Sequence, residues 1–224
     1  MPLSIAVLVS GSGSNLQAII DRIEAGVLDA RIGLVLSNRP EAFGLERARK
    51  HDIPALALPH TDYPDREAFD AAMIRAIRQA GAEAVILAGF MRMLTPGFLA
   101  AFSGRVLNIH PALLPSFAGT HGARDAADYG VKIAGCTVHF VDEIMDHGPV
   151  VIQAAVPALA GDDGDALAGR ILALEHRIYP QAIHWLAQGR LSVQGRKVHL
   201  APTGVPLADV TLGSLVSPPL EQGF

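Results

Sequence analysis

The sequence has one cysteine, few aromatic residues and no long apolar run. Cys136 cannot form a disulfide within the chain, and its place inside an apolar segment indicates a structural role. Half of the 224 residues are hydrophobic, yet no apolar stretch approaches the roughly 20 residues that a membrane-spanning helix needs. The N-terminus also lacks the basic segment of a secretory signal peptide. We therefore expect a soluble protein that stays in the cytoplasm and has no membrane partner.

An excess of positive charge is missing as well. The formal net charge is -4 and the pI is about 6.1, whereas a nucleic-acid-binding domain usually has a pI above about 9. This composition disfavours a nucleic-acid partner. It leaves small acidic ligands open, because the charge of a binding site need not follow the charge of the whole chain.

Several motifs of catalytic and cofactor sites are also absent. The nine histidines include no His-Glu-X-X-His, and no Cys-X-X-Cys occurs, so the sequence predicts no metal site. A Gly-X-Ser-X-Gly elbow is missing too, which disfavours a serine hydrolase. The first glycine loop has leucine where a dinucleotide site needs a third glycine, and no Gly-Lys-Ser/Thr follows it. These gaps disfavour NAD and nucleoside triphosphates as ligands.

Strand and helix patterns alternate along the chain. Apolar, β-branched segments predict strands, and helical spacing predicts helices that end near glycines. The strands fall at 3–9, 32–36, 84–88, 106–109, 133–141 and 150–156, and the helices at 16–25, 43–51, 66–80, 123–129 and 163–187. We expect an α/β fold with a mixed, mostly parallel sheet, in which 133–141 and 150–156 pair antiparallel. Residues 191–224 should add edge strands and a flexible tail that frays after Pro218.

The strand at 106–109 predicts an amide and an imidazole side by side. Side chains alternate along a strand, so Asn108 and His110 leave one face together, just before Pro111. Later in the chain, Asp146 lies in Asp-Glu-Ile-Met-Asp-His-Gly-Pro-Val. If Asp146 folds back, its carboxylate can raise the pKa of the histidine and favour acid–base chemistry. Taken alone, a histidine at a strand end is more often a structural residue.

The first loop predicts an anion site. Two glycines follow the strand at 3–9, and the N–H groups of Gly13, Ser14 and Asn15 then lie at the start of a helix. Unpaired donors and the helix dipole attract a phosphate at such a terminus. A two-glycine loop can equally serve only as a turn.

The longer sequence around these residues resembles the folate-dependent formyltransferases. Asn-Ile-His-Pro-Ala-Leu-Leu-Pro at 108–115 matches a motif of that family, Asp146 lies in its second motif, and the likeness covers residues 3–191. The resemblance implies a Rossmann-like three-layer formyltransferase fold, with the formyltransferase domain at 1–190 and residues 191–224 as an extension of the same domain. It also implies transfer of a formyl group from 10-formyltetrahydrofolate, a co-substrate, to the amine of glycinamide ribonucleotide in de novo purine biosynthesis. The expected assembly is a monomer or a homodimer.

The resemblance implies roles for individual residues. The implied catalytic residues are Asn108, which also contacts the folate, His110 and Asp146. Substrate contacts are implied for Gly13, Ser14 and Asn15 at the phosphate and for Glu175 at the glycinamide or ribose. Folate contacts are implied for Arg66, Met91, Arg92, Met93 and Leu94. Without the resemblance, Arg66 fits a solvated helix start, and Met91, Met93 and Leu94 fit ordinary core. His121 is expected to line the pocket, and His139 is expected to support the catalytic residues from behind.

Two departures from the family pattern concern the phosphate and ribose contacts. Leu172 occupies a position where relatives carry a polar residue, and Ala123 one where a second histidine can occur. The implied chemistry remains a direct attack by the amine on the formyl carbon, with Asn108 and protonated His110 donating to the oxyanion. Two alternatives stay open: a hydrolase that releases formate from the same folate, and a nucleotide-binding module without catalysis. Family hydrolases carry an extra N-terminal domain, and transfer-RNA formyltransferases an extra C-terminal one. We expect neither here.

Overall fold

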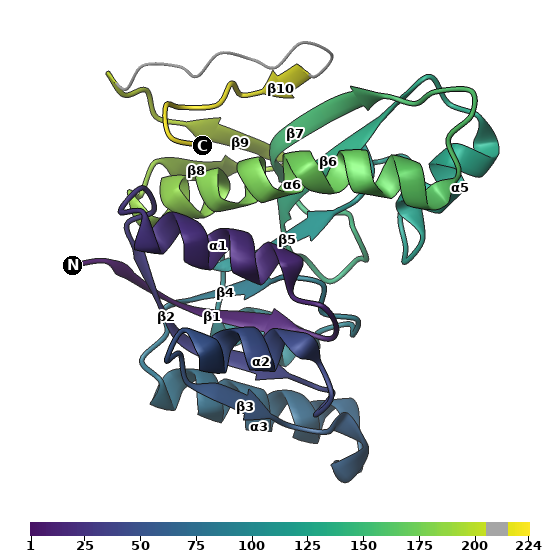
Figure 1. The fold of residues 1–224 in the computed structure, drawn as a ribbon. Helices are drawn as coiled ribbons and strands as arrows, with labels where there is room; N and C mark the ends of the chain where they lie inside the picture. Colours follow the sequence, from purple (N-terminus) through teal and green to yellow (C-terminus); the bar gives the residue numbers. More distant parts are fainter. Residues whose placement is uncertain (205–214) are drawn as a thin grey trace. The chain divides into compact units, whose positions relative to one another are not determined.

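The computed structural model describes residues 1–204 and 215–224 (Figure 1). By their contacts these residues form two compact units. The first comprises Met1–Asn108 with Val141–Glu143, and the second comprises Ile109–Phe140 with Ile144–Phe224. None of the helices in the described part of the chain is long and apolar enough to span a membrane.

The first unit is built on parallel strands. They are β1 (Leu3–Val9), β2 (Ala30–Ser37), β3 (Ala55–Ala57), β4 (Ala84–Leu87) and the start of β5 (Val106–His110), in the order β3-β2-β1-β4-β5. Every residue of β1 is buried. Burial on both faces explains why this strand is a continuous apolar run rather than an alternating pattern.

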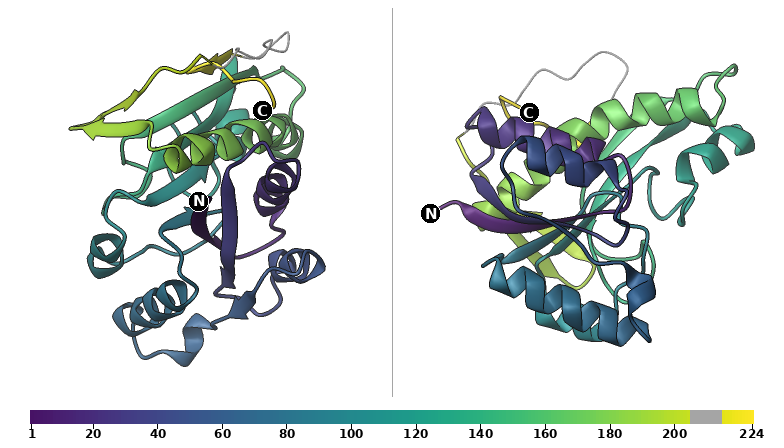
Figure 2. Two further views of the ribbon diagram at one scale, coloured as in Figure 1. Left: turned by 90° about the vertical axis from the view of Figure 1, so that its left-hand side faces the viewer. Right: turned by 60° about the horizontal axis from the view of Figure 1, so that its bottom comes forward.

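Helices cover both faces of these strands. They are α1 (Ser14–Glu24), α2 (Phe43–Lys50), η1 (His60–Asp62), α3 (Arg66–Gln79) and α4 (Pro96–Ala101). In the first unit, α1 and α2 lie on one face of the strands, and α3 and α4 on the other (Figure 2). Side chains of Asp65 and Thr95 accept hydrogen bonds from main-chain N–H groups at the starts of α3 and α4, which fixes where these helices begin.

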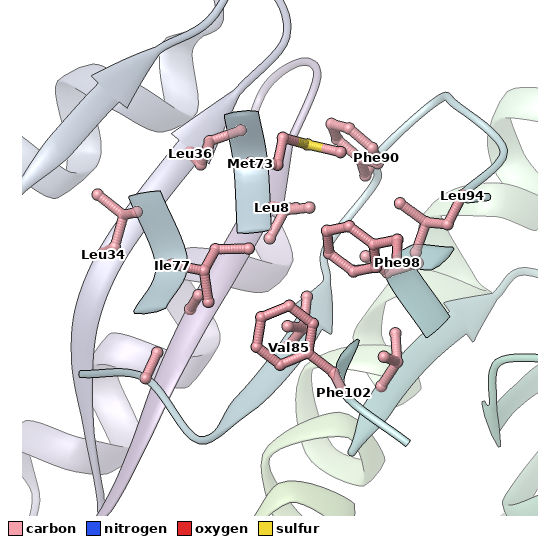
Figure 3. Packing of buried hydrophobic residues seen from close by; sticks show 14 of the residues in the cluster. Leu8, Leu34, Leu36, Met73, Ile77, Val85, Phe90, Leu94, Phe98 and Phe102 are labelled. Atoms are coloured by element: carbon pink, nitrogen blue, oxygen red, sulfur yellow. The ribbon is translucent and has the colours of Figure 1, made fainter. Parts of the chain in front are cut away.

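A core of apolar side chains joins α3 and α4 to the strands (Figure 3). Leu8 and Leu36 contribute one face of β1 and β2, while Met73 comes from α3 and Phe98 from α4. The Phe98 ring is fully buried, 5.2 Å from the ring of Phe102. Truncation of a phenylalanine buried in this way costs about 3–5 kcal/mol, so this cluster stabilises the first unit.

The second unit is mainly antiparallel. After α5 (Gly122–Tyr129), β6 (Ile133–Phe140) pairs antiparallel with β7 (Val150–Pro157), and α6 (Gly164–Ala187) packs on both strands. β8 (Leu191–Gln194) and β9 (Lys197–Leu200) form a hairpin beside β7, and β10 (Leu215–Ser217) pairs antiparallel with β7. The predicted α/β class with a mixed, mostly parallel sheet is confirmed.

The structure departs from the sequence predictions at short elements and at the chain end. The sequence did not predict β3, η1, α4 or β10, which are too short for a clear periodicity. The prediction of fraying after Pro218 was wrong, because Leu220 and Phe224 are buried and Glu221 forms a 2.6 Å ion pair with Arg190. Residues 205–214 of the predicted extension lie outside the described residues.

Candidate active site

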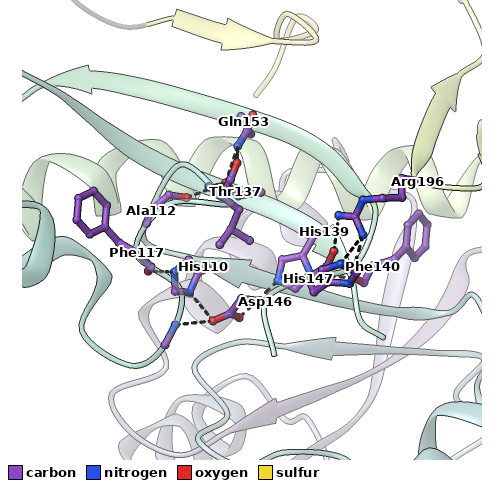
Figure 4. A network of polar contacts seen from close by, with 12 residues as sticks. His110, Ala112, Phe117, Thr137, His139, Phe140, Asp146, His147, Gln153 and Arg196 are labelled. Carbon is purple, nitrogen blue, oxygen red and sulfur yellow. Dashed lines mark hydrogen bonds and ion pairs between the residues drawn. The ribbon is translucent and has the colours of Figure 1, made fainter. Parts of the chain in front are cut away.

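His110 and Asp146 come together within the second unit. His110 is the last residue of β5, and Asp146 lies in the loop between β6 and β7, where its Oδ2 is 3.5 Å from His110 Nδ1 (Figure 4). The same oxygen accepts a 2.8 Å hydrogen bond from the main-chain N–H of Gly119. The side chains of His110 and Asp146 are only 4% and 11% exposed, so solvent screens their interaction weakly. The predicted return of Asp146 to His110 is therefore observed.

The second ring nitrogen of His110 is also engaged. Nε2 lies 2.8 Å from the main-chain carbonyl oxygen of Phe117. A carbonyl only accepts, so Nε2 must carry the proton and donate. The Nδ1 atom of His110 therefore faces the Asp146 carboxylate, and its Nε2 donates to the main chain at Phe117.

A second histidine flanks the same carboxylate. His139 Nδ1 lies 2.8 Å from the carbonyl oxygen of Phe140, and its Nε2 is 3.8 Å from Asp146 Oδ1. Nδ1 carries the proton and donates to the carbonyl, because a carbonyl only accepts. The structure thus places His139 beside the Asp146 carboxylate, and its supporting role stays a prediction.

The backbone directs Asp146 inward. Its φ of 51° lies in the left-handed region, which costs most residues roughly 1–3 kcal/mol but which aspartate and asparagine tolerate better. The preceding side chains Ile144 and Met145 are 61% and 48% exposed. The loop therefore turns one polar residue in while its apolar neighbours face out.

Two polar residues that the sequence analysis missed support the segment after His110. Thr137 of β6 donates to the carbonyl oxygen of Ala112 at 2.7 Å and accepts from the N–H of Leu114 at 3.1 Å. Gln153 of β7, the strand partner of Thr137, donates to the carbonyl oxygen of Leu114 at 2.9 Å. A threonine among the apolar residues Cys136 and Val138 of the predicted strand was the available signal. These bonds fix the Pro111–Pro115 segment next to the imidazole.

Cys136 is not placed for catalysis. It is a free, fully buried thiol, and burial, followed by the nearby Glu175 carboxylate, raises its pKa well above the usual value. A neutral buried thiol is a poor nucleophile. Its structural interpretation stands.

Asn108 and Glu175 occupy different parts of the fold. Asn108 belongs to the first unit. It is half-buried and in register with Leu87 of β4, two residues before His110 on β5. Glu175 lies on α6 in the second unit and is buried. The structure thus pairs His110 with Asp146 directly, and it places Asn108 on the same strand as His110.

In the first unit, the ends of β1, β2 and β4 meet at a serine that the sequence analysis did not single out. The N–H of Ser10 donates to Gly89 O at 3.1 Å, and its hydroxyl accepts from the N–H of Met91 at 2.9 Å. The same hydroxyl donates to Asn38 Oδ1 at 2.6 Å. Ser10 therefore ties the start of the glycine loop to the segment at 91–94.

The glycine loop leads directly into α1. Gly13 is the N-cap of α1 with φ 68°, and Ser14 is its first residue. A Cβ on Gly13 would stand 2.7 Å from the Cα of Gly44 at the start of α2, a distance that real Cβ atoms do not adopt. Arg47 of α2 donates from Nε to Ser12 O at 2.8 Å. The loop is thus backed closely by α2, and only glycine fits at position 13.

The residues implied to contact folate are also in the first unit, and they differ in exposure. Arg66 is the exposed first residue of α3, and the Arg92 guanidinium lies over the ring of Phe69, 5.6 Å from its centroid. Met91 is 58% exposed, whereas Leu94 is 6% exposed and belongs to the core cluster. The ordinary-core alternative therefore holds for Leu94 but not for Met91. Met93 is half-buried.

Within residues 1–204 and 215–224, no group of three or more His, Cys, Asp or Glu side chains is arranged to hold a metal ion.

Comparison with known proteins identifies the class of enzyme to which this chain belongs, with its mixed α/β fold and its buried pair of His110 and Asp146. The formyl transferase family model matches residues 3–183, and the chain belongs to this family. It is 46% identical over 191 residues to the phosphoribosylglycinamide formyltransferase of Escherichia coli, a match that covers 85% of this chain and 90% of the relative. The crystal structure of glycinamide ribonucleotide transformylase 1 from Symbiobacterium toebii is 50% identical with a TM-score of 0.89, covering 90% of this chain and 95% of that one. A formyltetrahydrofolate deformylase from Pseudomonas syringae is similar at 26% identity and a TM-score of 0.83, covering 90% of this chain and 67% of that one.

Proposed function

We propose that this protein transfers the formyl group of 10-formyltetrahydrofolate to the amine of glycinamide ribonucleotide in purine biosynthesis. The observation that carries the proposal is the buried pair of His110 Nδ1 and Asp146 Oδ2 at 3.5 Å, in a chain that is 46% identical to a phosphoribosylglycinamide formyltransferase over most of both lengths. Transfer to an amine needs polarisation of the formyl group and a route for a proton. The proposed catalytic residues Asn108, His110 and Asp146 are of the types that supply both.

The reaction begins when the neutral amine of the ribonucleotide attacks the formyl carbon. A C–N bond forms, and the electron pair of the formyl C=O moves to oxygen, which becomes negative. Asn108 and protonated His110 donate to this oxyanion. The tetrahedral centre then collapses, the bond to folate N10 breaks, and the proton lost by the amine reaches N10 through water or these side chains. The products are formylated ribonucleotide and tetrahydrofolate.

The oxyanion competes with a main-chain carbonyl for His110. In the structure, Nε2 donates to Phe117 O. A charged acceptor forms a roughly twofold stronger hydrogen bond than a neutral carbonyl, so the developing oxyanion can take over this donor. Asp146, held by the Gly119 N–H, keeps the ring oriented and balances the charge of an imidazolium.

The two substrates are assigned to loops of the first unit and to α6. Gly13, Ser14 and Asn15 offer N–H groups to the ribonucleotide phosphate at the start of α1, and Glu175 would contact the glycinamide or ribose. Arg66 and the stretch Met91, Arg92, Met93 and Leu94 would hold the folate, with exposed Met91 able to meet a ligand and buried Leu94 shaping the backbone beneath it. We also propose that the enzyme works in the cytoplasm, as a monomer or homodimer.

A formate-releasing hydrolase is the second candidate, because the deformylase from Pseudomonas syringae has a similar fold. Its identity of 26% is well below the 46% found for the Escherichia coli formyltransferase, which favours transfer. The decisive experiment is an absorbance assay of folate deformylation with and without glycinamide ribonucleotide. Strict dependence on the amine supports the transferase. Formate release without it would establish the hydrolase instead.

A further inference from the structure

The turn between β8 and β9 carries an arginine that reaches the loop of Asp146. β9 lies beside β7 through the pairing of Lys197 with Val150, the first residue of β7 after that loop. Arg196 immediately precedes Lys197 and occupies the turn. The hairpin lies outside residues 3–183, which match the family model. The contact of Arg196 with the Asp146 loop therefore comes from the C-terminal part of the chain.

Arg196 makes its contacts with the residue that follows Asp146. Its Nη2 donates to the carbonyl oxygen of His147 at 2.6 Å, and its Nη1 lies 2.9 Å from Nε2 and 3.2 Å from Nδ1 of the His147 ring (Figure 4). A guanidinium has only donors, so the ring can contribute only through a nitrogen that carries a lone pair. The carbonyl contact does not depend on the ring at all. Arg196 therefore binds the backbone of the Asp146 loop directly.

The side chains of the Asp146 loop provide little packing to stabilise its conformation. Asp146 is in the left-handed region with φ 51°, while Glu143, Ile144, Met145 and His147 are all exposed. Packing of side chains thus contributes little to holding this turn. The charge-assisted bond from Arg196 acts one peptide unit away from the strained residue.

We propose that Arg196 is a positioning residue, which holds the His147 carbonyl so that Asp146 stays against His110 and the Gly119 N–H. The inference rests on the proposed function, in which Asp146 orients His110. In this proposal Arg196 acts through His147 and does not donate to the oxyanion. Its loss lets the Asp146 loop sample other conformations and lowers the fraction of enzyme with an oriented imidazole.

The test compares Arg196→Ala with Arg196→Lys and with Lys197→Ala as the matched control. Lys197 is an exposed cation next in sequence, so its variant removes the same charge from the same hairpin. We expect Arg196→Ala to lower kcat about fivefold to tenfold with both KM values within about twofold, as loss of one charge-assisted hydrogen bond implies. Arg196→Lys, which can still donate to the carbonyl, should recover much of the rate. Lys197→Ala should match the wild type.

A double mutant distinguishes positioning from a general structural effect. If Arg196 acts through Asp146, Arg196→Ala should have little further effect in an Asp146→Asn background. An undiminished fivefold loss in that background would overturn the proposal. Equal losses in Arg196→Ala and Lys197→Ala, in folded proteins, would overturn it as well.

A readout without turnover keeps this test separate from the proposed function. The Gly119 amide donates to Asp146, so its hydrogen exchange should be several-fold faster in Arg196→Ala, while amides of β1 remain unchanged. A wild-type protein that does not formylate the ribonucleotide would refute the proposed function, yet the exchange of Gly119 would still decide the role of Arg196. Unchanged Gly119 exchange would refute that role.

Discussion

The Nε2 N–H of His110 donates to the main-chain carbonyl of Phe117 across 2.8 Å. Since Nδ1 faces Asp146 at 3.5 Å, both nitrogens of the ring already have partners within the chain. In the proposed reaction, the substrate oxyanion therefore has to displace the Phe117 carbonyl before His110 can donate to it. Phe117 itself has a φ of 52°, so the segment that must yield is held in an uncommon backbone conformation.

His110→Ala should remove most activity, while chelation of divalent ions should leave the wild-type rate unchanged. Protein donors, rather than a Lewis acid, stabilise the oxyanion in the proposed reaction, and loss of one such donor typically costs about a hundredfold to a thousandfold in rate. Steady-state kinetics of the variant and of the wild type after exhaustive dialysis against a chelator check this. Activity lost on chelation and restored by a divalent ion would make His110, His139 and Asp146 candidates for metal ligands instead.

Asp146→Asn should keep the fold and lower kcat by about a hundredfold. Asparagine tolerates the left-handed backbone at φ 51° and can still accept from the Gly119 N–H. It removes the negative charge that faces His110, so the effect should fall on turnover rather than on substrate binding. Circular dichroism verifies folding, and kcat and KM are measured for both substrates. Near-normal kcat in the folded variant would refute the assigned role of Asp146.

Arg47→Ala should raise the KM for the ribonucleotide about tenfold and leave the KM for the folate unchanged. The guanidinium donates to Ser12 O, and loss of a charge-assisted bond that shapes the proposed phosphate site weakens binding by roughly this factor. Arg49→Ala is the control, because Arg49 is on the same helix but pairs with Glu46. Valine at position 13 is a poor probe, since the clash with Gly44 would disturb folding itself. Equal increases in both KM values would contradict a phosphate-specific loop.

Asp162→Asn should destabilise the protein at neutral pH but progressively less in acid. Both carboxylate oxygens of Asp162 accept from Arg170, at 2.7 and 2.9 Å, and these bonds, followed by the N–H of Leu159, lower the Asp162 pKa from 3.8 to about 2. A depressed pKa contributes stability above the ordinary value, and this contribution is lost as pH falls from near 3.8 toward about 2. Denaturant unfolding of the wild type and Asp162→Asn at several pH values in this range measures the difference. A stability gap that does not narrow in acid would contradict the prediction.

Periodicity and glycine positions predicted most of the fold because long, two-sided burial leaves a strong pattern. β1 is almost entirely apolar, and α6 begins at Gly164, within one residue of the predicted start. β3 and α4 were missed because three to six residues cannot establish a period. Fraying after Pro218 was predicted from composition. The buried anchors Leu220 and Phe224, and the Glu221–Arg190 pair, depend on contacts that composition does not encode.

The candidate site was predictable where its residues are close in sequence or recur in a family motif. Asn108 and His110 share a strand, and Asp146 lies in a second motif, so the approach of Asp146 to His110 could be anticipated. Phe117, Ser10 and Arg196 could not be found in that way. Their contributions come from a main-chain carbonyl, from a hydroxyl where three strand ends meet and from a hairpin turn beside a loop, and none of these leaves a distinctive residue spacing.

The close approach of Gly13 to Gly44 has a consequence for redesign of this enzyme. A Cβ at 13 would lie 2.7 Å from the Cα of Gly44, and a Cβ at 44 would lie 2.9 Å from Cγ2 of Val9. A library that diversifies the glycine loop must therefore keep Gly13 fixed and leave Gly44 of α2 unchanged. At Gly11, by contrast, a Cβ would meet nothing within 4 Å, and the backbone there is not left-handed. If the loop binds the phosphate as proposed, variation aimed at a differently shaped phosphate ester should start at position 11.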